Sequence, residues 1–338
     1  MRVLFAGSPE IAVPSLRAVA GAAELVGVLT NPESQKGRGL GSSATAVAIA
    51  AGGLAPSGAK ASPSGGGVPI LSFERLGSEA RNAVAALEPD LLVSFAYGRI
   101  FGPKFLSVFP RGGINVHPSL LPRWRGPTPI PAAILHRDAE SGVCVQRIAL
   151  PGASGSGIDE GDILAQERIV LDERETTASL SDKAARIGAE LVAEVVKAIA
   201  EGRESARAQV GEASHSSLLA KDDGLIDWSA PVANIDALVR AFDPWPLAFT
   251  HFRGLRLAIL EAVAYPGCGW LPPSTLAPGA PPSAAAGTIL GLDKSLGLMV
   301  QGIDGLVALR RLQLQQKKAL PWRDFANGLR DLMGARLG

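Results

Sequence analysis

The chain has 338 residues, of which 47% are apolar, and its formal net charge is +1. A chain of this length is longer than one that usually folds around a single hydrophobic core, so two domains are expected. The balanced charge excludes a broadly polycationic protein, so any nucleic-acid contact must come from local basic patches. The two cysteines, Cys144 and Cys268, lie far apart. They indicate a reducing compartment and exclude a disulfide framework.

The sequence excludes several other classes of protein. The first residues lack the apolar run and cleavage site of a secretory signal, and no apolar stretch approaches the ~20 residues that a membrane span needs. The four histidines are not grouped with carboxylates at ligand spacing, so no metal site is expected. We therefore expect a cytoplasmic protein that contacts no membrane.

The N-terminal part alternates short apolar runs with helical patterns. Residues 3–6 and 25–29 are apolar runs, and residues 11–20 between them have apolar positions at helical spacing. This order predicts the start of an α/β doubly wound parallel sheet. The first turn lacks the Gly-x-Gly-x-x-Gly spacing of a dinucleotide site, so a nicotinamide cofactor is not expected. Further helices are expected over 44–51, 78–87, 126–136 and 178–201, and further strands over 90–95, 143–150 and 165–171.

A glycine-rich loop with two basic residues follows the second strand. It runs from Thr30 to Gly41 and carries Lys36 and Arg38. On the residues alone, an exposed and solvated loop is the better interpretation. The low-complexity stretch at 52–67 indicates a flexible insertion without chemistry.

The segment from Ile114 to Arg125 carries the residues best suited to chemistry. Asn115 and His117 are two apart, so on an extended strand both side chains leave the same face. Pro118 cannot donate to a sheet ladder and favours an extended conformation at His117, which places the pair at the end of a strand. Ligands of open α/β sheets bind at the carboxyl ends of strands. There, an amide donor would lie beside an imidazole that titrates near neutral pH.

Residues 115–126 read Asn-Val-His-Pro-Ser-Leu-Leu-Pro-Arg-Trp-Arg-Gly. This segment resembles the signature of the formyltransferases that use 10-formyltetrahydrofolate, and its Arg-Trp-Arg-Gly end is most similar to the branch that acts on methionyl-tRNA. The resemblance spans almost the whole chain, interrupted at 52–67, 149–157 and 267–286. It implies a Rossmann-like domain followed by a small OB-like β-barrel, and transfer of a formyl group from 10-formyltetrahydrofolate to the amino group of methionyl initiator tRNA.

The same resemblance implies a third catalytic residue. The family carries an Asp in a Leu-Asp-x-Gly-Asp segment, which falls on Asp159, whereas Asp162 is the competing carboxylate and is expected to be structural. The preceding connection is longer here than in the family, so residues 149–157 are interpreted as an insertion, and Ala149 occupies a position that is often acidic. A longer loop is therefore expected to carry Asp159.

An amide, an imidazole and a carboxylate suit acyl transfer to an amine. Asn115 can donate to the negative charge that develops on the formyl oxygen. His117 can hydrogen-bond the same oxygen and assist proton movement, while Asp159 can orient His117 and collect the proton of the attacking amine. No Ser or Cys in the segment is placed as an obvious nucleophile, so direct transfer is expected.

The resemblance also implies a folate pocket. The family binds the pterin ring largely through backbone groups near a turn that follows a strand, and the matching turn here is Phe95-Ala96-Tyr97-Gly98. The facing loop begins at Ser119. The predicted folate-binding residues are Phe95, Tyr97, Ser119, Leu120, Leu121 and Pro122. Tyr97 has a second interpretation, as an amphipathic ring packed at a domain edge.

In the resembled family, the basic loop after the second strand reaches the acceptor end of the tRNA. Its Gly-Arg-Gly matches residues 37–39, so Lys36 and Arg38 are candidate tRNA contacts. The flanking basic residues are fewer than usual, because Ser34 and Gln35 replace an Arg-Pro pair and Leu40-Gly41 replaces lysines. Each lost phosphate contact lowers the slope of log affinity against log salt concentration by about one unit. Weaker binding of tRNA by this loop is therefore expected.

The C-terminal part supplies a second domain. The predicted boundaries are a catalytic domain over 1–203, a linker over 204–214 and a tRNA-contacting domain over 215–338. The segment that ends in Ile226-Asp227-Trp228 is similar to the family's Lys-Glu-Glu-x-x-Ile-Asp-Trp, and Asp243-Pro-Trp-Pro is similar to its Asn-Pro-Trp-Pro. A short helix is expected over residues 236–242.

Short β-type runs in this part predict a small open barrel of the Greek-key kind. They lie at 248–252, 255–264, 287–290, 296–300 and 305–314, and a Pro/Ala insertion interrupts them at 267–286. Lys317 and Lys318, followed by Trp322, form a basic and aromatic edge that could contact an RNA backbone. The alternative for the two lysines is a solvated charge pair.

Other functions remain open on the sequence. They are formyl transfer to an amino-sugar nucleotide, hydrolysis that releases formate, and RNA binding by a chain with a degenerate catalytic half. The Arg-Trp-Arg-Gly segment and the Asp-Pro-Trp-Pro junction favour tRNA, and a glycinamide ribonucleotide transformylase would normally lack the second domain. The expected partners are initiator methionyl-tRNA and the folate co-substrate, without a metal, and we expect a monomer.

Overall fold

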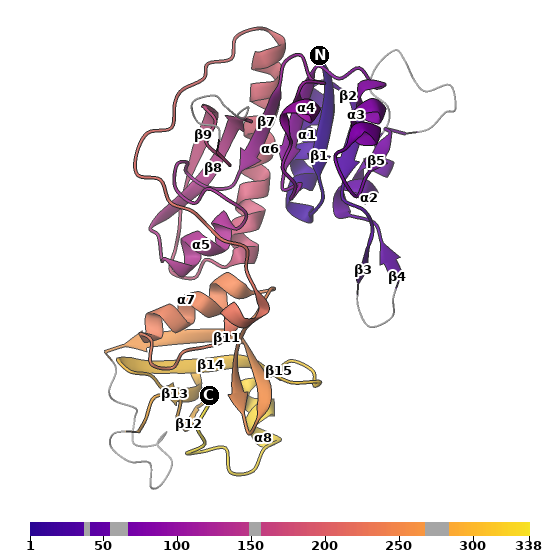
Figure 1. The fold of residues 1–338 in the computed structure, drawn as a ribbon. Coiled ribbons are helices and arrows are strands. Elements are labelled where there is room, and N and C mark those ends of the chain that lie inside the picture. Colours follow the sequence, from indigo (N-terminus) through magenta and orange to yellow (C-terminus); the bar gives the residue numbers. More distant parts are fainter. Residues whose placement is uncertain (37–40, 55–66, 149–156, 268–283) are drawn as a thin grey trace. The chain divides into compact units, whose positions relative to one another are not determined.

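A computed structural model describes residues 1–36, 41–54, 67–148, 157–267 and 284–338. The chain divides into two compact units (Figure 1). Unit 1 comprises Met1–Pro129, Glu140–Leu171 and Leu180–Ser217, and unit 2 comprises Ile130–Ala139, Asp172–Ser179 and Leu218–Gly338. The segment predicted as a linker, 204–214, belongs to unit 1. The predicted domain boundaries stay a prediction, and most of the three predicted insertions lies outside the described residues.

Unit 1 is built on a seven-stranded sheet with the order β5-β2-β1-β6-β7-β8-β9. Its strands are β1 (Arg2–Gly7), β2 (Glu24–Thr30), β5 (Ile70–Ser72), β6 (Leu91–Phe95), β7 (Gly113–His117), β8 (Glu140–Arg147) and β9 (Ile163–Val170). The strands from β5 to β7 in this order are parallel, whereas β8 and β9 pair antiparallel. The predicted Rossmann-like sheet is confirmed, and two antiparallel strands extend one edge.

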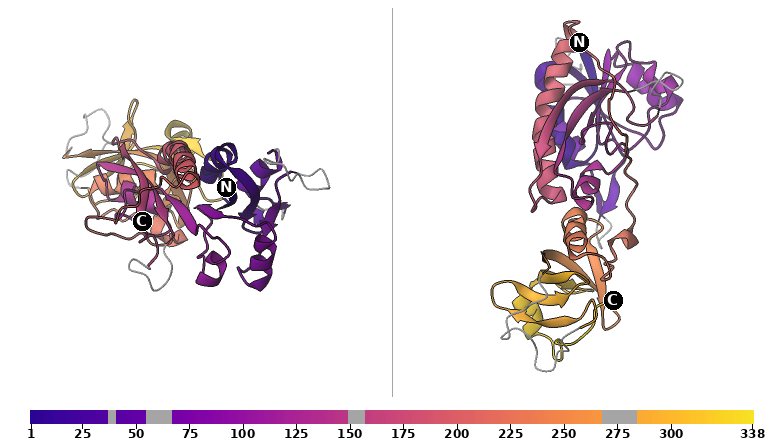
Figure 2. Two further views of the ribbon diagram at one scale, coloured as in Figure 1. Left: turned by 90° about the horizontal axis from the view of Figure 1, so that it is seen from above. Right: turned by 90° about the vertical axis from the view of Figure 1, so that its left-hand side faces the viewer.

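Helices cover both faces of this sheet (Figures 1 and 2). They are η1 (Glu10–Ala12), α1 (Val13–Ala22), α2 (Ala46–Gly52), α3 (Ser78–Ala85), α4 (Pro103–Leu106) and α6 (Thr177–Ala200). The helix α6 packs against β6 and β7 through Gly188, where an added Cβ would lie 3.0 Å from Val116 and 3.7 Å from Phe95. This close approach brings α6 against the strand that carries Asn115 and His117.

The opposite face of the sheet packs against α3 and α4. The buried residues of this cluster are Leu4, Ala6, Leu29, Ala80, Val84, Leu92, Tyr97, Phe101, Phe105, Leu106 and Phe109. The four aromatic rings are spaced four residues apart, and successive ring centroids lie 5.3, 5.6 and 5.8 Å from each other. Because side chains alternate along a strand, the sheet divides the apolar residues of unit 1 into two layers.

A short hairpin is present where the sequence indicated only a loop. β3 (Ser34–Lys36) pairs antiparallel with β4 (Gly41–Ser43), with Ser34 opposite Ser43. Serine, glutamine and glycine carry little β-propensity, so the pattern gave no strand signal, and the pairing depends on backbone hydrogen bonds. The intervening residues 37–40, which include Arg38, lie outside the described residues.

Unit 2 contains an antiparallel sheet with the order β10-β11-β14-β13-β12, and β15 pairs with β14. Its strands are β10 (Ala248–Phe252), β11 (Leu255–Pro266), β12 (Ile289–Asp293), β13 (Gly297–Gln301), β14 (Gly305–Leu314) and β15 (Leu320–Pro321). The hairpin strands β12, β13 and β14, with β11 beside β14, form a Greek-key arrangement. The predicted insertion at 267–286 falls in the long connection from β11 to β12.

The remaining helices are α5 (Pro129–Leu135), η2 (Lys221–Gly224), α7 (Val232–Phe242) and α8 (Trp322–Asn327). The helix α7 begins four residues earlier than expected, and its N-cap is Pro231. Its buried residues Val232, Ile235 and Val239 recur at helical spacing and join the core of unit 2. Neither β15 nor α8 was predicted, because this part was considered only for the basic and aromatic edge of Lys317, Lys318 and Trp322.

We predict that Gly142→Ala on β8 lowers the urea midpoint of unfolding. The added Cβ would lie 2.3 Å from the carbonyl oxygen of Glu167 and 2.4 Å from the side chain of Leu120. Overpacking of this kind costs about 1–3 kcal/mol. Tryptophan fluorescence follows the transition.

The control for this substitution is Gly21→Ala on α1, because an added Cβ there has nothing within 4 Å. It is expected to raise the midpoint slightly, since alanine favours a helix over glycine. Equal midpoints for the two variants would contradict the packing argument.

Candidate active site

The strand β7 carries the first two predicted catalytic residues and ends at His117, as the sequence indicated. Asn115 is opposite Ser94 of β6 and opposite Gln146 of β8. Asn115 is half-buried, whereas the side chain of His117 is only 4% exposed. Both side chains therefore lie at the carboxyl end of β7, the end at which open α/β sheets bind ligands.

Asp159 lies against both of these residues. Its Oδ2 is 3.5 Å from Nδ1 of His117, and its Oδ1 is 3.4 Å from Nδ2 of Asn115. The structure therefore brings together the three residues that the sequence singled out. The competing carboxylate, Asp162, is exposed, and its backbone carbonyl accepts from the amide of Arg147.

Two shorter hydrogen bonds hold the carboxylate of Asp159. The backbone N–H of Gly126 donates to Oδ2 at 2.9 Å, and Nε2 of Gln146 donates to Oδ1 at 2.8 Å. Gly126 has a φ of +103°, which favours glycine. Asp159 itself has a φ of +57°, a left-handed conformation that Asp tolerates better than most residues. The carboxylate thus receives donors from two segments that are distant in sequence.

The second ring nitrogen of His117 fixes the orientation of the imidazole. Nε2 lies 2.9 Å from the backbone carbonyl oxygen of Trp124. A carbonyl can only accept, so Nε2 carries the proton of this hydrogen bond. The other ring nitrogen, Nδ1, faces Asp159.

The loop after His117, which is predicted to bind the folate, contacts a buried thiol through its backbone. Sγ of Cys144 donates to the carbonyl oxygen of Ser119 at 3.0 Å and accepts from the amide of Leu121 at 3.4 Å. Burial raises the pKa of Cys144 to about 11. Leu121 and Ser119 are buried, as is Pro122, and Leu120 contacts Gly142. These side chains mainly shape the loop, so the groups it offers to a ligand are chiefly in its backbone.

The other predicted folate residues also point into the core. Phe95 and Tyr97 are both 1% exposed, and the Tyr97 ring stacks on Phe101. Burial raises the pKa of Tyr97. The carbonyl oxygen of Tyr97 accepts from Nδ2 of Asn31 at 2.8 Å. Among the described residues, Oδ1 of Asn31 is buried and has no hydrogen-bond partner. This turn thus presents backbone groups beside an unsatisfied amide oxygen.

Sequence reasoning missed four polar residues that support the site: Arg125, Gln146, Glu160 and Gln209. Arg125 Nη1 pairs with Glu160 at 2.9 Å, and Gln209 Oε1 accepts from Arg125 Nη2 at 2.8 Å. Gln146 is identifiable only from the pairing of β7 with β8, which no local pattern encodes. Gln209 lies in the segment that was interpreted as a linker, where a polar residue gave no signal.

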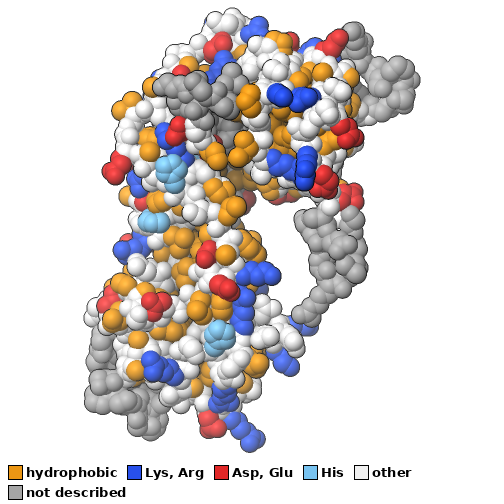
Figure 3. Space-filling model, in the orientation of Figure 1, with side chains coloured by type: hydrophobic (Ala, Val, Ile, Leu, Met, Phe, Trp, Pro, Cys, Tyr) orange, Lys and Arg blue, Asp and Glu red, His pale blue; other side chains and the backbone are white. Residues whose placement is uncertain are grey.

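Two of the four predicted tRNA contacts, Lys317 and Lys318, are described as exposed. Lys36 ends β3, and Arg38 lies outside the described residues. Lys317 and Lys318 are both exposed in the turn between β14 and β15. Figure 3 shows Lys and Arg side chains on the surface of both units.

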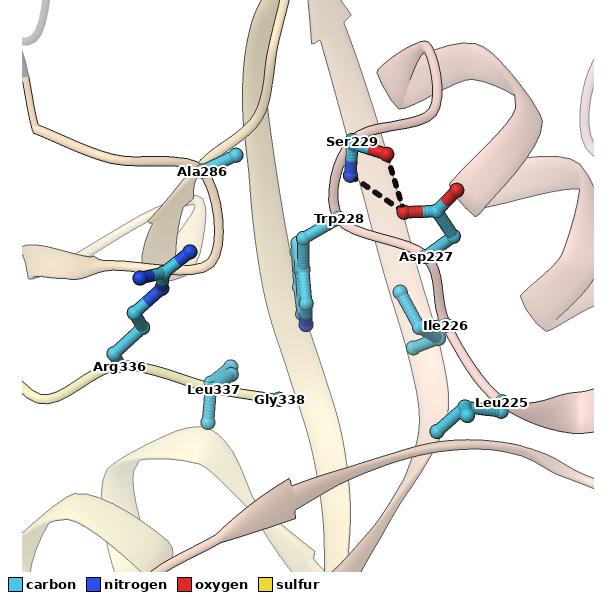
Figure 4. A pocket seen from close by; sticks show the side chains of 9 residues that line it. All are labelled: Leu225, Ile226, Asp227, Trp228, Ser229, Ala286, Arg336, Leu337 and Gly338. Carbon is cyan, nitrogen blue, oxygen red and sulfur yellow. Dashed lines mark hydrogen bonds between the residues drawn. The ribbon is translucent and has the colours of Figure 1, made fainter.

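A pocket of about 650 Å³ lies within unit 2, and its lining includes none of the predicted site residues. Its lining residues are Leu225, Ile226, Asp227, Trp228, Ser229, Ala286, Arg336, Leu337 and Gly338. In Figure 4 the Trp228 ring lies between Arg336 and Asp227. Two hydrogen bonds from Ser229 hold the pKa of Asp227 below its usual value. Asp227 and Ser229, two of the polar residues of the pocket, are thus hydrogen-bonded to each other.

Two further properties concern the described part of the chain. Within it, no group of three or more His, Cys, Asp or Glu side chains could hold a metal ion. Along the same ranges, no helix has both the length and the apolar character needed to cross a lipid bilayer.

Residues 3–196 match the family model of formyl transferase, and residues 218–330 match that of the formyl transferase C-terminal domain. The chain belongs to the formyl transferase family. A methionyl-tRNA formyltransferase of Treponema pallidum is 45% identical to this family member over 344 residues, which cover 100% of the chain and 99% of the relative. One of Treponema denticola is 41% identical and covers 98% of each.

A solved formyltransferase also shares the fold of this family member. It is the N-formyltransferase of Helicobacter canadensis in complex with folinic acid and dTDP-3-aminofucose. The two structures superpose with a TM-score of 0.60 at 17% identity, over 94% of this chain and 99% of the other. At this identity the likeness concerns the fold alone.

We predict that Cys144 resists alkylation by iodoacetamide at pH 8 in the folded protein. With a pKa of about 11, about one thiol in a thousand is ionised at that pH, and the thiolate is the reactive form. The extent of labelling is measured by mass spectrometry of the peptide that contains Cys144, with and without urea. Labelling should accelerate as the pH rises toward 11, and equal rates in the folded and unfolded protein would contradict the assignment.

Proposed function

We propose that this chain transfers a formyl group from 10-formyltetrahydrofolate to the amino group of methionyl initiator tRNA. The observation that carries the proposal is the convergence of Asn115, His117 and Asp159 at the end of β7, in a chain that is 45% identical to a methionyl-tRNA formyltransferase over its full length. The proposal includes action as a monomer in the cytoplasm, where translation initiates.

Asn115 is the proposed donor to the formyl oxygen. When the amine nitrogen attacks the formyl carbon, negative charge develops on this oxygen, and a donor placed there lowers the barrier. The 3.4 Å contact between Asn115 and Asp159 is long for a hydrogen bond. The amide of Asn115 therefore keeps donor capacity for a substrate oxygen.

His117 and Asp159 are the proposed proton-handling pair. The attacking amine loses a proton as its bond to the formyl carbon forms, and the nitrogen of the folate gains one as its bond to that carbon breaks. Asp159 accepts the first proton and can share it with Nδ1 of His117, which lies 3.5 Å from it, and the pair then returns a proton to the folate nitrogen as that nitrogen leaves. Because Nε2 is bonded to Trp124, proton movement is assigned to Nδ1.

The predicted folate residues fit a pterin through their backbone. A pterin edge carries both donors and acceptors, so it needs a partner of each kind. The buried Oδ1 of Asn31, unpartnered among the described residues, can accept a hydrogen bond beside the turn that contains Tyr97. The walls of the proposed pterin pocket are shaped by Phe95 and Leu121. The loop on its other side is shaped by Ser119, Leu120 and Pro122. Binding through these groups supplies the formyl donor of the reaction.

The tRNA would be held by basic side chains from both parts of the sequence. Lys36 and Arg38 are proposed to contact the acceptor end, as the motif resemblance implies. Lys317 and Lys318 are exposed residues of unit 2 and are proposed to contact phosphates of the tRNA. A chain that only bound RNA would not require the converged amide, imidazole and carboxylate, so the enzyme reading is favoured.

We predict that His117→Ala abolishes formyl transfer and that Asn115→Ala slows it by about 10²–10³, whereas both variants still bind tRNA. Transfer is measured with 10-formyltetrahydrofolate and charged initiator tRNA, beside an amino-sugar nucleotide that should not be formylated. The control is His136→Ala on the neighbouring part of the chain, where the ring nitrogen bonds the carbonyl oxygen of Ala132. Transfer by His117→Ala at the wild-type rate would refute the mechanism.

We predict that the double substitution Lys317→Ala and Lys318→Ala raises the KM for tRNA and leaves the KM for the folate unchanged. Each lost phosphate contact should lower the slope of log affinity against log salt by about one unit. The charge-matched control is Lys104→Ala with Lys197→Ala, which removes two exposed lysines of unit 1. Equal effects of the two double variants on tRNA would count against the assignment.

A further inference from the structure

The carboxylate of Asp159 is held by a glutamine that the reaction chemistry does not require. Gln146 on β8 is 1% exposed, and its Nε2 donates to Oδ1 of Asp159 at 2.8 Å. This is shorter than the 3.4 Å contact from Asn115 to the same oxygen. Gln146 is opposite Asn115 in the β7–β8 pair, so the strand register sets its position. The stronger hydrogen bond to Oδ1 therefore comes from a residue outside the proposed catalytic three.

A second glutamine, Gln209, holds the backbone at Asp159 and two residues after it. Nε2 of Gln209 donates to the carbonyl oxygens of Asp159 and Gly161, each at 2.8 Å. An amide nitrogen has two protons, so these two bonds use both, and the 3.4 Å contact to Oε1 of Gln146 is secondary. Oε1 of Gln209 accepts from Nε and Nη2 of Arg125 at 3.1 and 2.8 Å.

Asp159 depends on such support more than an ordinary loop residue does. Its φ of +57° lies in the left-handed region, which costs free energy for a residue other than glycine unless its surroundings fix it. The side chain must also present Oδ1 to Asn115 and Oδ2 to His117 at once. A rotation of the carboxylate would break both contacts, and a misplacement of about 1 Å at a reacting group can cost about a hundredfold in rate.

We propose that Gln146 and Gln209 are positioning residues for the formyl transfer, with Gln146 setting the direction of the Asp159 carboxylate and Gln209 setting its backbone. Neither side chain needs to touch a substrate for this role. The inference rests on the proposed function. It adds that the placement of the Asp159 carboxylate depends on two side-chain amides, one from β8 and one from the segment after α6. The role predicts an effect on kcat with little effect on either KM.

The charged groups around the two amides define the test. Gln146 faces Asp159, with His117 on the other oxygen of that carboxylate, and Gln209 faces Arg125, which pairs with Glu160. In Gln146→Glu, the new carboxyl group would face the carboxylate of Asp159. Like charges raise the pKa of one member of such a pair, so the new group can donate a hydrogen bond when protonated and repels Asp159 when ionised.

The first experiment measures kcat for Gln146→Glu relative to wild type between pH 5.5 and 8.5. We expect kcat to fall about tenfold or more at the upper end, to recover toward wild type as the pH falls, and both KM values to stay within about twofold. The control is Gln301→Glu on β13, which removes donors to the carbonyl oxygens of Gly302 and Gly305 and should show a ratio that is independent of pH. A flat ratio for Gln146→Glu, or a loss confined to KM, overturns the proposal.

The second experiment separates the two sides of Gln209. Gln209→Glu keeps an acceptor for Arg125 but cannot donate to the carbonyl oxygens of Asp159 and Gly161 when ionised, whereas Gln209→Ala loses both functions. We expect kcat to fall to a similar extent in both variants. A wild-type kcat in Gln209→Glu would show that Gln209 acts through its contact with Arg125. It would overturn the proposal that Gln209 acts by holding the backbone of Asp159.

A readout that does not need turnover keeps this inference separate from the proposed function. The NMR chemical shifts of the His117 ring, measured at one pH, report the place of the Asp159 carboxylate, and Gln146→Glu and Gln209→Ala should each change them relative to wild type. If wild type formylates no tRNA, the proposed function fails, and these shifts still decide the positioning role. Unchanged ring shifts in both variants overturn that role even where wild type is active.

Discussion

The site depends on one carboxylate that is bonded from several sides. Oδ1 of Asp159 receives Gln146 and Asn115, and Oδ2 receives the backbone N–H of Gly126 and faces His117. These donors come from β7, β8 and the turn before α5, so their meeting requires the sheet order and the antiparallel pairing of β8 with β7 to be correct. A shift of one residue in that register would turn Gln146 away from Asp159.

Sequence patterns predicted the positions of Asn115 and His117 because these depend only on neighbouring residues in one strand. The alternation of a strand places Asn115 and His117 on one face, and a following proline ends the strand where the structure ends it. Short β-type runs likewise located β10 to β14 in unit 2, although β12 begins two residues later than expected and ends three residues later. By contrast, β3 and β4 are stabilised by backbone pairing between residues of low β-propensity, and Gln146 and Gln209 act through contacts that depend on register and on chain segments far apart. Sequence periodicity contains no information on either.

The motif around His117 contains structural residues as well as reactive ones. Ser119 and Leu121 are buried against Cys144, and Trp124 contributes its carbonyl oxygen to His117. These buried contacts fix the shape of the loop that follows His117. A long specific motif is therefore expected here, because a backbone that must present a carbonyl, an amide and a turn in fixed places constrains many side chains at once.

The distances within the site divide it into support and chemistry. The contacts that Asp159 makes with Gly126 and Gln146 are 2.9 and 2.8 Å, whereas those with His117 and Asn115 are 3.5 and 3.4 Å. The short hydrogen bonds from Gly126 and Gln146 hold the carboxylate in place. The longer contacts leave Nδ2 of Asn115 able to donate elsewhere and Nδ1 of His117 able to accept, as their proposed roles require. Preorganisation of this kind acts on the transition state, because the supporting bonds need not rearrange as charge develops.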